Sequence, residues 1–199
     1  MKKRVILKTG RAAPFIQKHP WVFSGAVDKI DDSIQNGDFV NVWDHKGKFL
    51  GQGLFNGNSS ITVRLFHFLD ESESFENILK SSLKHAIALR KTLYDAEQTN
   101  ALRLINGEGD FLPGLICDFY KDQLVFQFNS LGLYQRKMII TQLVTEYCRE
   151  ILGINMRTTF DRTPDKIITL EGIQKENDIN SSHQPVNRTE IKENGFRFY

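Results

Sequence analysis

The first third of the chain shows the apolar and polar pattern of a small β-rich domain. Residues 61–66 alternate strictly between apolar and polar, as a strand with one buried face does. A short helix is expected at 11–18, with Pro14 in its first turn, where the missing N–H has no consequence. The other predicted strands of this region span 5–8, 39–44 and 49–55. We therefore expect a first domain over 1–70.

A different periodicity begins near residue 75. Apolar residues recur at spacings of three and four over 75–94, and Ser72 or Ser74 can cap the start of this predicted helix. A second stretch with the same periodicity spans 134–152. Strands are predicted at 102–105, 115–120, 123–129 and 156–160. Neighbouring strands with helices packed on one face make an α+β domain, which we place at 72–170.

The end of the chain predicts a hairpin. Asn194-Gly195 is the strongest short-range hairpin signal, and it separates two strand-like segments at 189–192 and 196–199. Residues 171–185 are polar and are expected to form a loop. A chain that stops inside the second strand of a hairpin is typical of the front part of a longer protein. We therefore interpret 171–199 as a linker and the start of a hairpin that leads into a further domain.

Composition excludes several protein classes. Of the 199 residues, 40% are hydrophobic and 25% are charged, as in ordinary globular domains. No apolar run approaches the ~18 residues that span a membrane, and the N-terminus has no signal-peptide pattern. The two cysteines do not make a disulfide framework. These observations favour a cytoplasmic protein with no membrane partner.

The charge distribution is more informative than the formal net charge of +2. Six lysines and arginines precede the first acidic residue, Asp28, so the first 27 residues carry +6 and the rest of the chain carries −4. A local basic face of this kind is typical of proteins that bind a polyanion. The alternative is a solvated surface with no partner, and charge alone does not separate the two interpretations.

Two glycine-rich stretches approach a nucleotide-binding motif. Gly51 and Gly53 form one, Gly107 and Gly109 the other, and both stretches miss the last glycine of G-x-G-x-x-G. Neither is predicted to open a helix, which the pyrophosphate geometry requires. We therefore expect bulges or turns at these positions and no cofactor-binding residue.

The candidates for catalysis are weak. Cys117 on a predicted strand and Cys148 in a predicted helix have no nearby histidine, and we expect both to be buried and structural. The five histidines lack metal-ligand spacing, so no metal site is expected. Two carboxylate pairs stand close in sequence, Glu108 with Asp110 and Asp161 with Asp165. Turn formation and helix capping explain them better than acid–base catalysis, and we expect no catalytic residue.

Four stretches resemble the large-subunit ribosomal RNA cytosine-C5 methyltransferases. Arg11 with 18–27 (KHPWVFSGAV), and 47–56 (GKFLGQGLFN) with 59–64 (SSITVR), resemble the PUA-type module of that family. The stretch 103–118 (RLINGEGDFLPGLICD) resembles its central α+β domain. The stretch 193–196 (ENGF) resembles the hairpin that leads into its Rossmann-like methyltransferase domain.

The resemblance implies a fold and a function. The fold would be α+β, with an N-terminal β-rich PUA-like pseudo-barrel followed by an α+β domain of strand-strand-helix-strand type. The chain would be the RNA-binding and linker portion of an S-adenosylmethionine-dependent transferase that acts in ribosomal RNA processing. That family methylates carbon 5 of a cytosine, a base that must be flipped out of a helix. The cofactor-binding and catalytic domain has no counterpart here, so this chain alone is expected to be inactive and S-adenosylmethionine belongs to the full-length family.

The same reasoning names an RNA-binding surface. Phosphate contacts require lysine and arginine, and RNA recognition also uses stacking on aromatic rings. The predicted RNA-binding residues are Arg4, Arg11, Lys18, His19 and Arg64. Trp21 adjoins them, but its position beside Val22 and Phe23 favours burial in the core over base stacking. The expected partner is structured RNA, ribosomal by resemblance, and a homodimer is possible. The alternatives are a stand-alone RNA-binding adaptor and a protein-interaction module with a merely solvated basic face.

Overall fold

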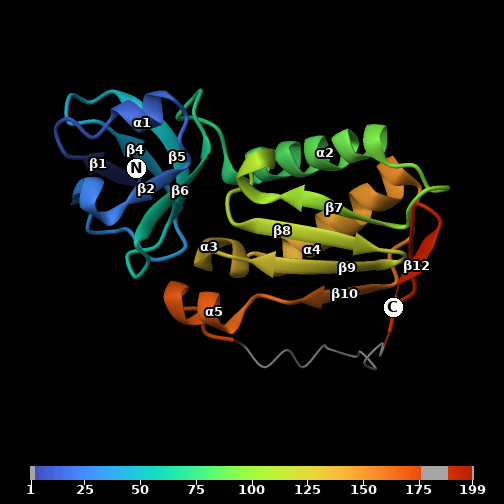
Figure 1. Ribbon diagram of the computed structural model, residues 1–199. Helices are drawn as coiled ribbons and strands as arrows, with labels where there is room; N and C mark the ends of the chain where they lie inside the picture. Colours follow the sequence, from blue (N-terminus) through green and yellow to red (C-terminus); the bar gives the residue numbers. More distant parts are fainter. Residues whose placement is uncertain (1–2, 176–187, 199) are drawn as a thin grey trace.

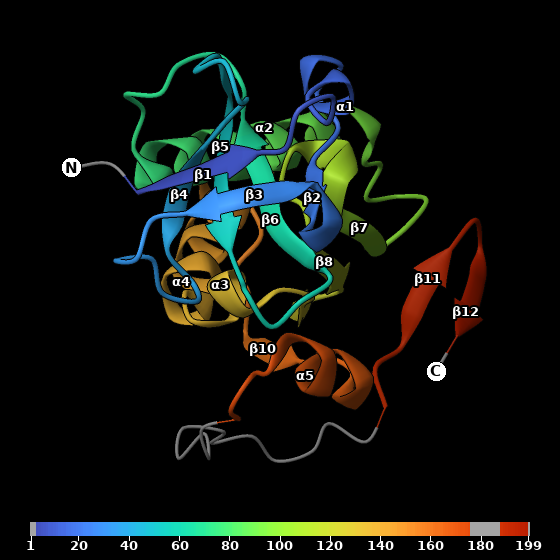
Figure 2. The same cartoon turned by 90° about the vertical axis from the view of Figure 1, so that its left-hand side faces the viewer.

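Figure 1 shows the computed structural model, which describes residues 3–175 and 188–198. The first seventy residues form a curled six-stranded sheet, a β half-barrel, in the strand order β2-β6-β5-β4-β1-β3. Neighbouring strands are antiparallel except β1 and β4, which are parallel. The elements are β1 (Arg4–Leu7), α1 (Ala13–Ile16), β2 (Trp21–Phe23), β3 (Val27–Ile30), β4 (Phe39–Trp43), β5 (Phe49–Phe55) and β6 (Ile61–His67). Figure 2 views this half-barrel end-on.

The strands of the half-barrel close over an apolar core because inward positions alternate with outward ones. Val5, Leu7, Val22 and Val63 are fully buried in it. The glycines of β5 serve close packing rather than nucleotide binding. A Cβ at Gly53 would lie 2.1 Å from the backbone oxygen of Arg64 on the neighbouring strand. The interpretation of this stretch as a bulge is confirmed, since the register of β5 with β6 shifts between Gln52 and Gly53.

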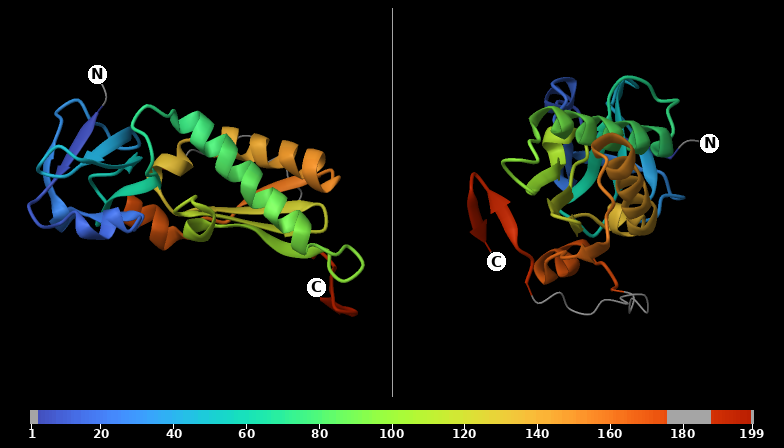
Figure 3. Two further views of the ribbon diagram at one scale, coloured as in Figure 1. Left: turned by 90° about the horizontal axis from the view of Figure 1, so that it is seen from above. Right: turned by 90° about the vertical axis from the view of Figure 1, so that its right-hand side faces the viewer.

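The second part of the chain is a layered α+β structure. Its four-stranded sheet has the order β10-β9-β8-β7, with β10 parallel to β9 and the other pairs antiparallel. Helices α2 and α4 lie together over one face of this sheet (Figure 3). The elements are α2 (Phe75–Leu93), β7 (Ala101–Asn106), β8 (Leu115–Tyr120), β9 (Gln123–Phe128), α3 (Leu131–Tyr134), α4 (Lys137–Tyr147), β10 (Thr158–Asp161) and α5 (Asp165–Glu171). A single 3-10 turn, Gly107–Asp110, follows β7.

Local sequence explains both long helices. The Ser74 side chain accepts a hydrogen bond from the Asn77 amide and caps α2, one of the two caps predicted. The short helix α3 is separate and ends at Tyr134, and the single helix expected over 134–152 is instead α4 followed by a wider π-type turn, Cys148–Leu152. Gly153 ends it in the left-handed conformation, φ 74°, where the absence of a Cβ avoids strain.

Strand β3 and helix α5 are among the elements that the sequence pattern did not predict. Strand β3 pairs with β1 on the edge of the half-barrel. Helix α5 (Asp165–Glu171) begins after Pro164 and is followed by Gly172, in a segment to which the sequence pattern assigned no helix. The predicted loop at 171–185 begins with the last residue of α5, and its residues 176–185 lie outside the described residues.

The predicted C-terminal hairpin is confirmed. Strands β11 (Ile191–Glu193) and β12 (Phe196–Phe198) pair antiparallel, and Asn194 and Gly195 take φ values of 49° and 85° in the turn. Both central residues therefore have the positive φ of a type I′ turn. The hairpin is attached to the segment after α2, because the Asn194 amide donates to the Gln98 carbonyl at 2.9 Å.

The two parts of the chain share apolar contacts. Leu54 of β5 and Phe66 of β6 belong to the core of the second part rather than to that of the half-barrel. The mixed α+β class with a curled β half-barrel is thus shown, while the domain limits 1–70, 72–170 and 171–199 stay a prediction, as does a homodimer. Within the described residues, no helix is long and apolar enough to cross a bilayer.

Candidate nucleic-acid interface

Trp21 and Glu108 form a hydrogen bond across the junction between the half-barrel and the second part. The indole Nε1 of Trp21, on β2, donates a hydrogen bond of 2.8 Å to Glu108 Oε1 in the turn after β7. The pairing of β2 with β6 places Arg64 directly opposite Trp21. The basic segment before β2 therefore lies beside the glycine-rich loop 106–114, two features that the sequence analysis treated separately.

This glycine-rich loop is fixed to helix α2 by a buried ion pair. Two nitrogens of Arg90 contact the two carboxylate oxygens of Asp110 at 2.6 and 2.7 Å. Asp110 also accepts a 2.6 Å hydrogen bond from the Asn106 amide. Bidentate arginine–carboxylate pairs fix geometry as well as charge. The interpretation of Glu108 and Asp110 as structural rather than catalytic is supported by these contacts.

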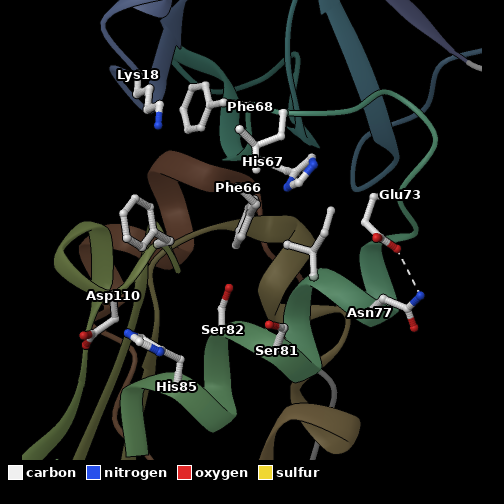
Figure 4. A pocket seen from close by; sticks show the side chains of 13 residues that line it. Lys18, Phe66, His67, Phe68, Glu73, Asn77, Ser81, Ser82, His85 and Asp110 are labelled. Atoms are coloured by element: carbon white, nitrogen blue, oxygen red, sulfur yellow. Dashed lines mark hydrogen bonds between the residues drawn. The ribbon is translucent and has the colours of Figure 1, made fainter. Parts of the chain in front are cut away.

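Two cavities are lined by residues of both the half-barrel and the glycine-rich loop. One, of about 440 Å³, is lined by Trp21, Arg64, Glu108 and Asn129, among others. The other, of about 500 Å³, lies on the opposite side of the loop between β6, helix α2 and Lys18. Figure 4 shows this larger cavity, with Lys18 and Phe68 on the half-barrel side and Ser82 and His85 on the helix side. Both volumes fall within the range of small-ligand sites.

The structure brings three of the predicted RNA-binding residues together. Arg11, Lys18 and His19 are exposed and flank the short helix α1. Lys18 follows the end of α1 with φ 62° and lines the larger cavity. His19 Nδ1 accepts a hydrogen bond from the Trp21 amide, and its ring packs edge-to-face on the indole at 6.0 Å. Arg4 is also exposed but lies at the opposite end of β1.

Arg64 is placed differently from the other predicted residues. It is 8% exposed, and its Nη2 contacts Glu171 Oε1 at 2.9 Å. Glu171 in turn accepts hydrogen bonds from Asn56, Ser59 and the amide of Leu131. The guanidinium thus forms part of a buried network that joins β6 to α5.

The preference for Trp21 as a core residue is wrong. Trp21 is half-buried and belongs to neither apolar core, whereas its neighbour Val22 is fully buried. The reason is the strand alternation: β2 points Val22 inward and Trp21 outward, toward the second part of the chain. The exposed Phe23 packs edge-to-face on the indole at 6.3 Å.

The expectation of inert cysteines is confirmed. Both are fully buried, and burial raises the pKa of the Cys148 thiol to about 12. Burial, with a smaller contribution from neighbouring Cys148, also raises the pKa of the Cys117 thiol well above its ordinary value. Asp161 accepts hydrogen bonds from the amide and hydroxyl of Thr163, as a turn residue does. Among the residues that the structure describes, no group of three potential metal ligands occurs.

The sequence analysis missed several residues of the larger cavity. Phe111, Phe68 and His85 line it, and no motif marks Phe68 or His85, whereas Phe111 lies within the stretch 103–118. Phe111 alone carries a recognisable signal, because a large aromatic residue inside a glycine-rich turn is unusual.

Comparison with known proteins covers almost the whole chain. A family model for a PUA-like domain matches residues 5–68. Ribosomal RNA large subunit methyltransferase I of Alteromonas mediterranea is 32% identical over 195 residues, which cover 98% of this chain and 47% of that protein. The protein of the same name from Shigella flexneri is 33% identical over 197 residues, covering 98% of this chain and 48% of that protein.

Solved structures share the fold. A candidate SAM-dependent methyltransferase from Streptococcus mutans superposes with a TM-score of 0.70 at 16% identity, covering 100% of this chain and 48% of that one. A candidate methyltransferase solved with SAH gives the same score and identity and is covered to 47%. The chain therefore spans about half the length of the relatives it matches. It contains a PUA-like domain at residues 5–68 and is homologous, over nearly its whole length, to part of the ribosomal RNA large subunit methyltransferases I.

Proposed function

We propose that this chain is the RNA-binding and linker portion of an S-adenosylmethionine-dependent methyltransferase that modifies large-subunit ribosomal RNA in the cytoplasm. The observation that carries the proposal is the alignment of 98% of the chain with ribosomal RNA large subunit methyltransferase I at 32% identity. The role of the chain is to hold the RNA so that the correct nucleotide reaches the catalytic domain.

The contact surface is the exposed basic face around α1. Arg11, Lys18 and His19 are exposed there, and the structure gives the Arg11 and Lys18 side chains no ion-pair partner among the described residues. Free cations of this kind neutralise phosphates and release counterions. Arg64 is assigned a structural role in this proposal, because its buried pair with Glu171 leaves little of the guanidinium for a phosphate. Arg4 extends the basic surface to the far end of β1.

A salt series tests the RNA-binding role. Binding of the chain to a fragment of large-subunit ribosomal RNA is measured over a range of salt concentrations, for wild type and for the Arg11→Ala/Lys18→Ala variant. The slope of log affinity against log salt is expected to fall by roughly 0.7 to 0.9 for each phosphate contact removed. Lys121→Ala is the matched control, since Lys121 is exposed in the turn between β8 and β9, away from α1. An unchanged slope in the double variant would show that the basic face is merely solvated.

The finer part of the proposal concerns the target, carbon 5 of a cytosine. It rests on the resemblance of 103–118 and of the PUA-type stretches to the cytosine-C5 enzymes. Bisulfite sequencing of ribosomal RNA from cells with and without the gene tests it. One cytosine of the large subunit should lose its protection from deamination in the deletion strain and regain it on complementation. No change at any cytosine would contradict the assignment.

A further inference from the structure

The larger cavity at the junction has the size and the walls of a ligand site. Its volume is about 500 Å³, and its floor is apolar, with Phe66 and Ile78 both buried. Figure 4 shows Phe66 and Phe68 facing Ser82 across the opening. Phe111 stands at its edge with 58% of its surface exposed. Aromatic faces and an apolar floor suit a flat, partly apolar ligand.

The rim of the cavity carries unused polar groups. No hydrogen bond joins the hydroxyls of Ser81 and Ser82 or the ring of His85 to any described residue, and all three line the cavity. The Lys18 ammonium, also without an ion-pair partner in the described part of the chain, stands on the opposite rim. The hydrogen-bond donors and acceptors on one wall match the edge of a base, and the cation on the opposite wall matches a phosphate.

Two residues with left-handed backbone line the same cavity. Four described residues other than glycine have positive φ, and two of them, Lys18 at 62° and Phe111 at 58°, line it. Left-handed backbone costs a residue with a Cβ roughly 1–2 kcal/mol, and glycine takes this conformation without that cost. The other two, Lys121 and Asn194, lie in two-residue turns between paired strands. Lys18 directly follows the C-cap of α1, and Phe111 is the C-cap of the 3-10 turn Gly107–Asp110, positions where left-handed backbone commonly ends a helical turn. The ends of these two turns place two large side chains on one opening.

We propose that this cavity binds one unstacked nucleobase of a single-stranded RNA segment. The base lies against the Phe111 and Phe68 rings, its edge meets Ser82 and His85, and its phosphate contacts Lys18. The proposal rests on the proposed RNA-binding function and adds to it the position and the kind of nucleotide contact. A base is favoured over a peptide side chain, because a flat ring with an adjacent phosphate uses the aromatic faces and the lysine together.

The first experiment removes the two ligand contacts separately, and Lys18→Gly also removes the cost of a Cβ at positive φ. Lys18→Gly is expected to leave the melting temperature unchanged or raised, yet to lower affinity for single-stranded ribosomal RNA and to reduce the salt slope by roughly 0.7. Lys121→Gly is the matched control, a lysine at the same φ of 62° far from the cavity, and its affinity should equal that of wild type. Phe111→Ala should weaken binding roughly 5- to 150-fold with no change in the salt slope, as loss of stacking does.

These outcomes separate the inference from the function on which it rests. If wild type binds no RNA, the proposed function fails. If wild type binds RNA and Arg11→Ala/Lys18→Ala lowers the salt slope, while Phe111→Ala binds as wild type does, the basic face stands and the cavity proposal is overturned. If Phe111→Ala loses affinity only together with a lowered melting temperature, the residue is structural and the proposal is likewise overturned.

A second experiment locates the ligand directly. Cytidine and adenosine monophosphate are titrated into the isotope-labelled protein, with ribose 5-phosphate as the comparison that lacks a base. Amide shifts at Ser82, His85 and Phe111 are expected with the nucleotides and not with ribose 5-phosphate. Equal shifts with all three compounds would show a phosphate contact alone. Shifts with none of them, while a peptide displaces RNA, would show a protein site instead, and either result would reject the base pocket.

Discussion

Arg64 and Glu171 stand 107 positions apart in the chain, and their side chains meet at 2.9 Å in the interior. The carboxylate of Glu171 also accepts from the side chains of Asn56 and Ser59 and from the amide of Leu131. Each of its oxygens therefore has two donors, which is what a buried carboxylate requires. One side chain thus joins the half-barrel, α3 and α5, and it holds the walls of the smaller cavity in place.

Removing this carboxylate should destabilise the fold strongly. Glu171→Ala leaves Arg64 buried without its counter-charge, at an expected loss of about 3–5 kcal/mol in the free energy of unfolding. The double variant Arg64→Met/Glu171→Leu should be less destabilised than Glu171→Ala, because it leaves no unpaired charge. Urea denaturation followed by circular dichroism measures both. A loss below about 1 kcal/mol in Glu171→Ala would show that the network is open to water.

The contact of Trp21 with Glu108 should contribute little on its own. Trp21→Phe keeps an aromatic ring and removes the indole donor, so we expect a loss of about 1 kcal/mol in the free energy of unfolding. Trp43→Phe is the control, because the buried Nε1 of Trp43 has no hydrogen-bond partner within the described structure. That variant loses only packing. A cost of 3 kcal/mol or more for Trp21→Phe would mean that the indole is a core residue after all.

The two buried cysteines give the fold an alkaline limit. Burial raises the pKa of Cys148 to about 12, whereas an unfolded thiol titrates near 9. The stability that this difference provides is complete below the unfolded value and is lost as the pH rises from about 9 toward 12. We expect the urea midpoint of the wild type to fall over this range. In Cys148→Ala, the midpoint at alkaline pH should lie closer to that variant's own midpoint at pH 7. A thiol reagent at pH 8 should label neither cysteine before unfolding, and rapid labelling of the native protein would contradict their burial.

Gly53 should tolerate no side chain. A Cβ there would lie 2.1 Å from the backbone oxygen of Arg64, so Gly53→Ala must separate β5 from β6. We expect the free energy of unfolding to fall by about 3 kcal/mol or more. Gly25→Ala is the matched control, since a Cβ at Gly25 meets no atom within 4 Å. The melting temperatures of the two variants should therefore differ by several degrees. Equal melting temperatures would mean that β5 and β6 can separate at the register shift with little loss of stability.

Several features of this protein follow from local sequence alone. The limits of β5, the cap of α2 at Ser74 and the hairpin turn at Asn194-Gly195 agree with the pattern-based prediction. Each depends on interactions within a few residues: side-chain alternation, a serine beside a free amide, and a residue pair that accepts positive φ. The burial of the two cysteines follows for a similar reason, because each lies in a predicted strand or helix with no histidine near it in sequence.

The candidate site required the tertiary structure. No residue near Arg64 in sequence indicates that its side chain pairs with Glu171. Helix α5, which carries Glu171, was not predicted, because its short apolar pattern follows a proline and a turn-like segment. Trp21 faces outward because β2 pairs with β6 in a register that only the closed sheet specifies. The larger cavity joins Lys18, Phe68, His85 and Phe111 from separate parts of the chain. Sequence periodicity determines which face of an element is apolar, but the packing of the elements decides which residues meet across the junction.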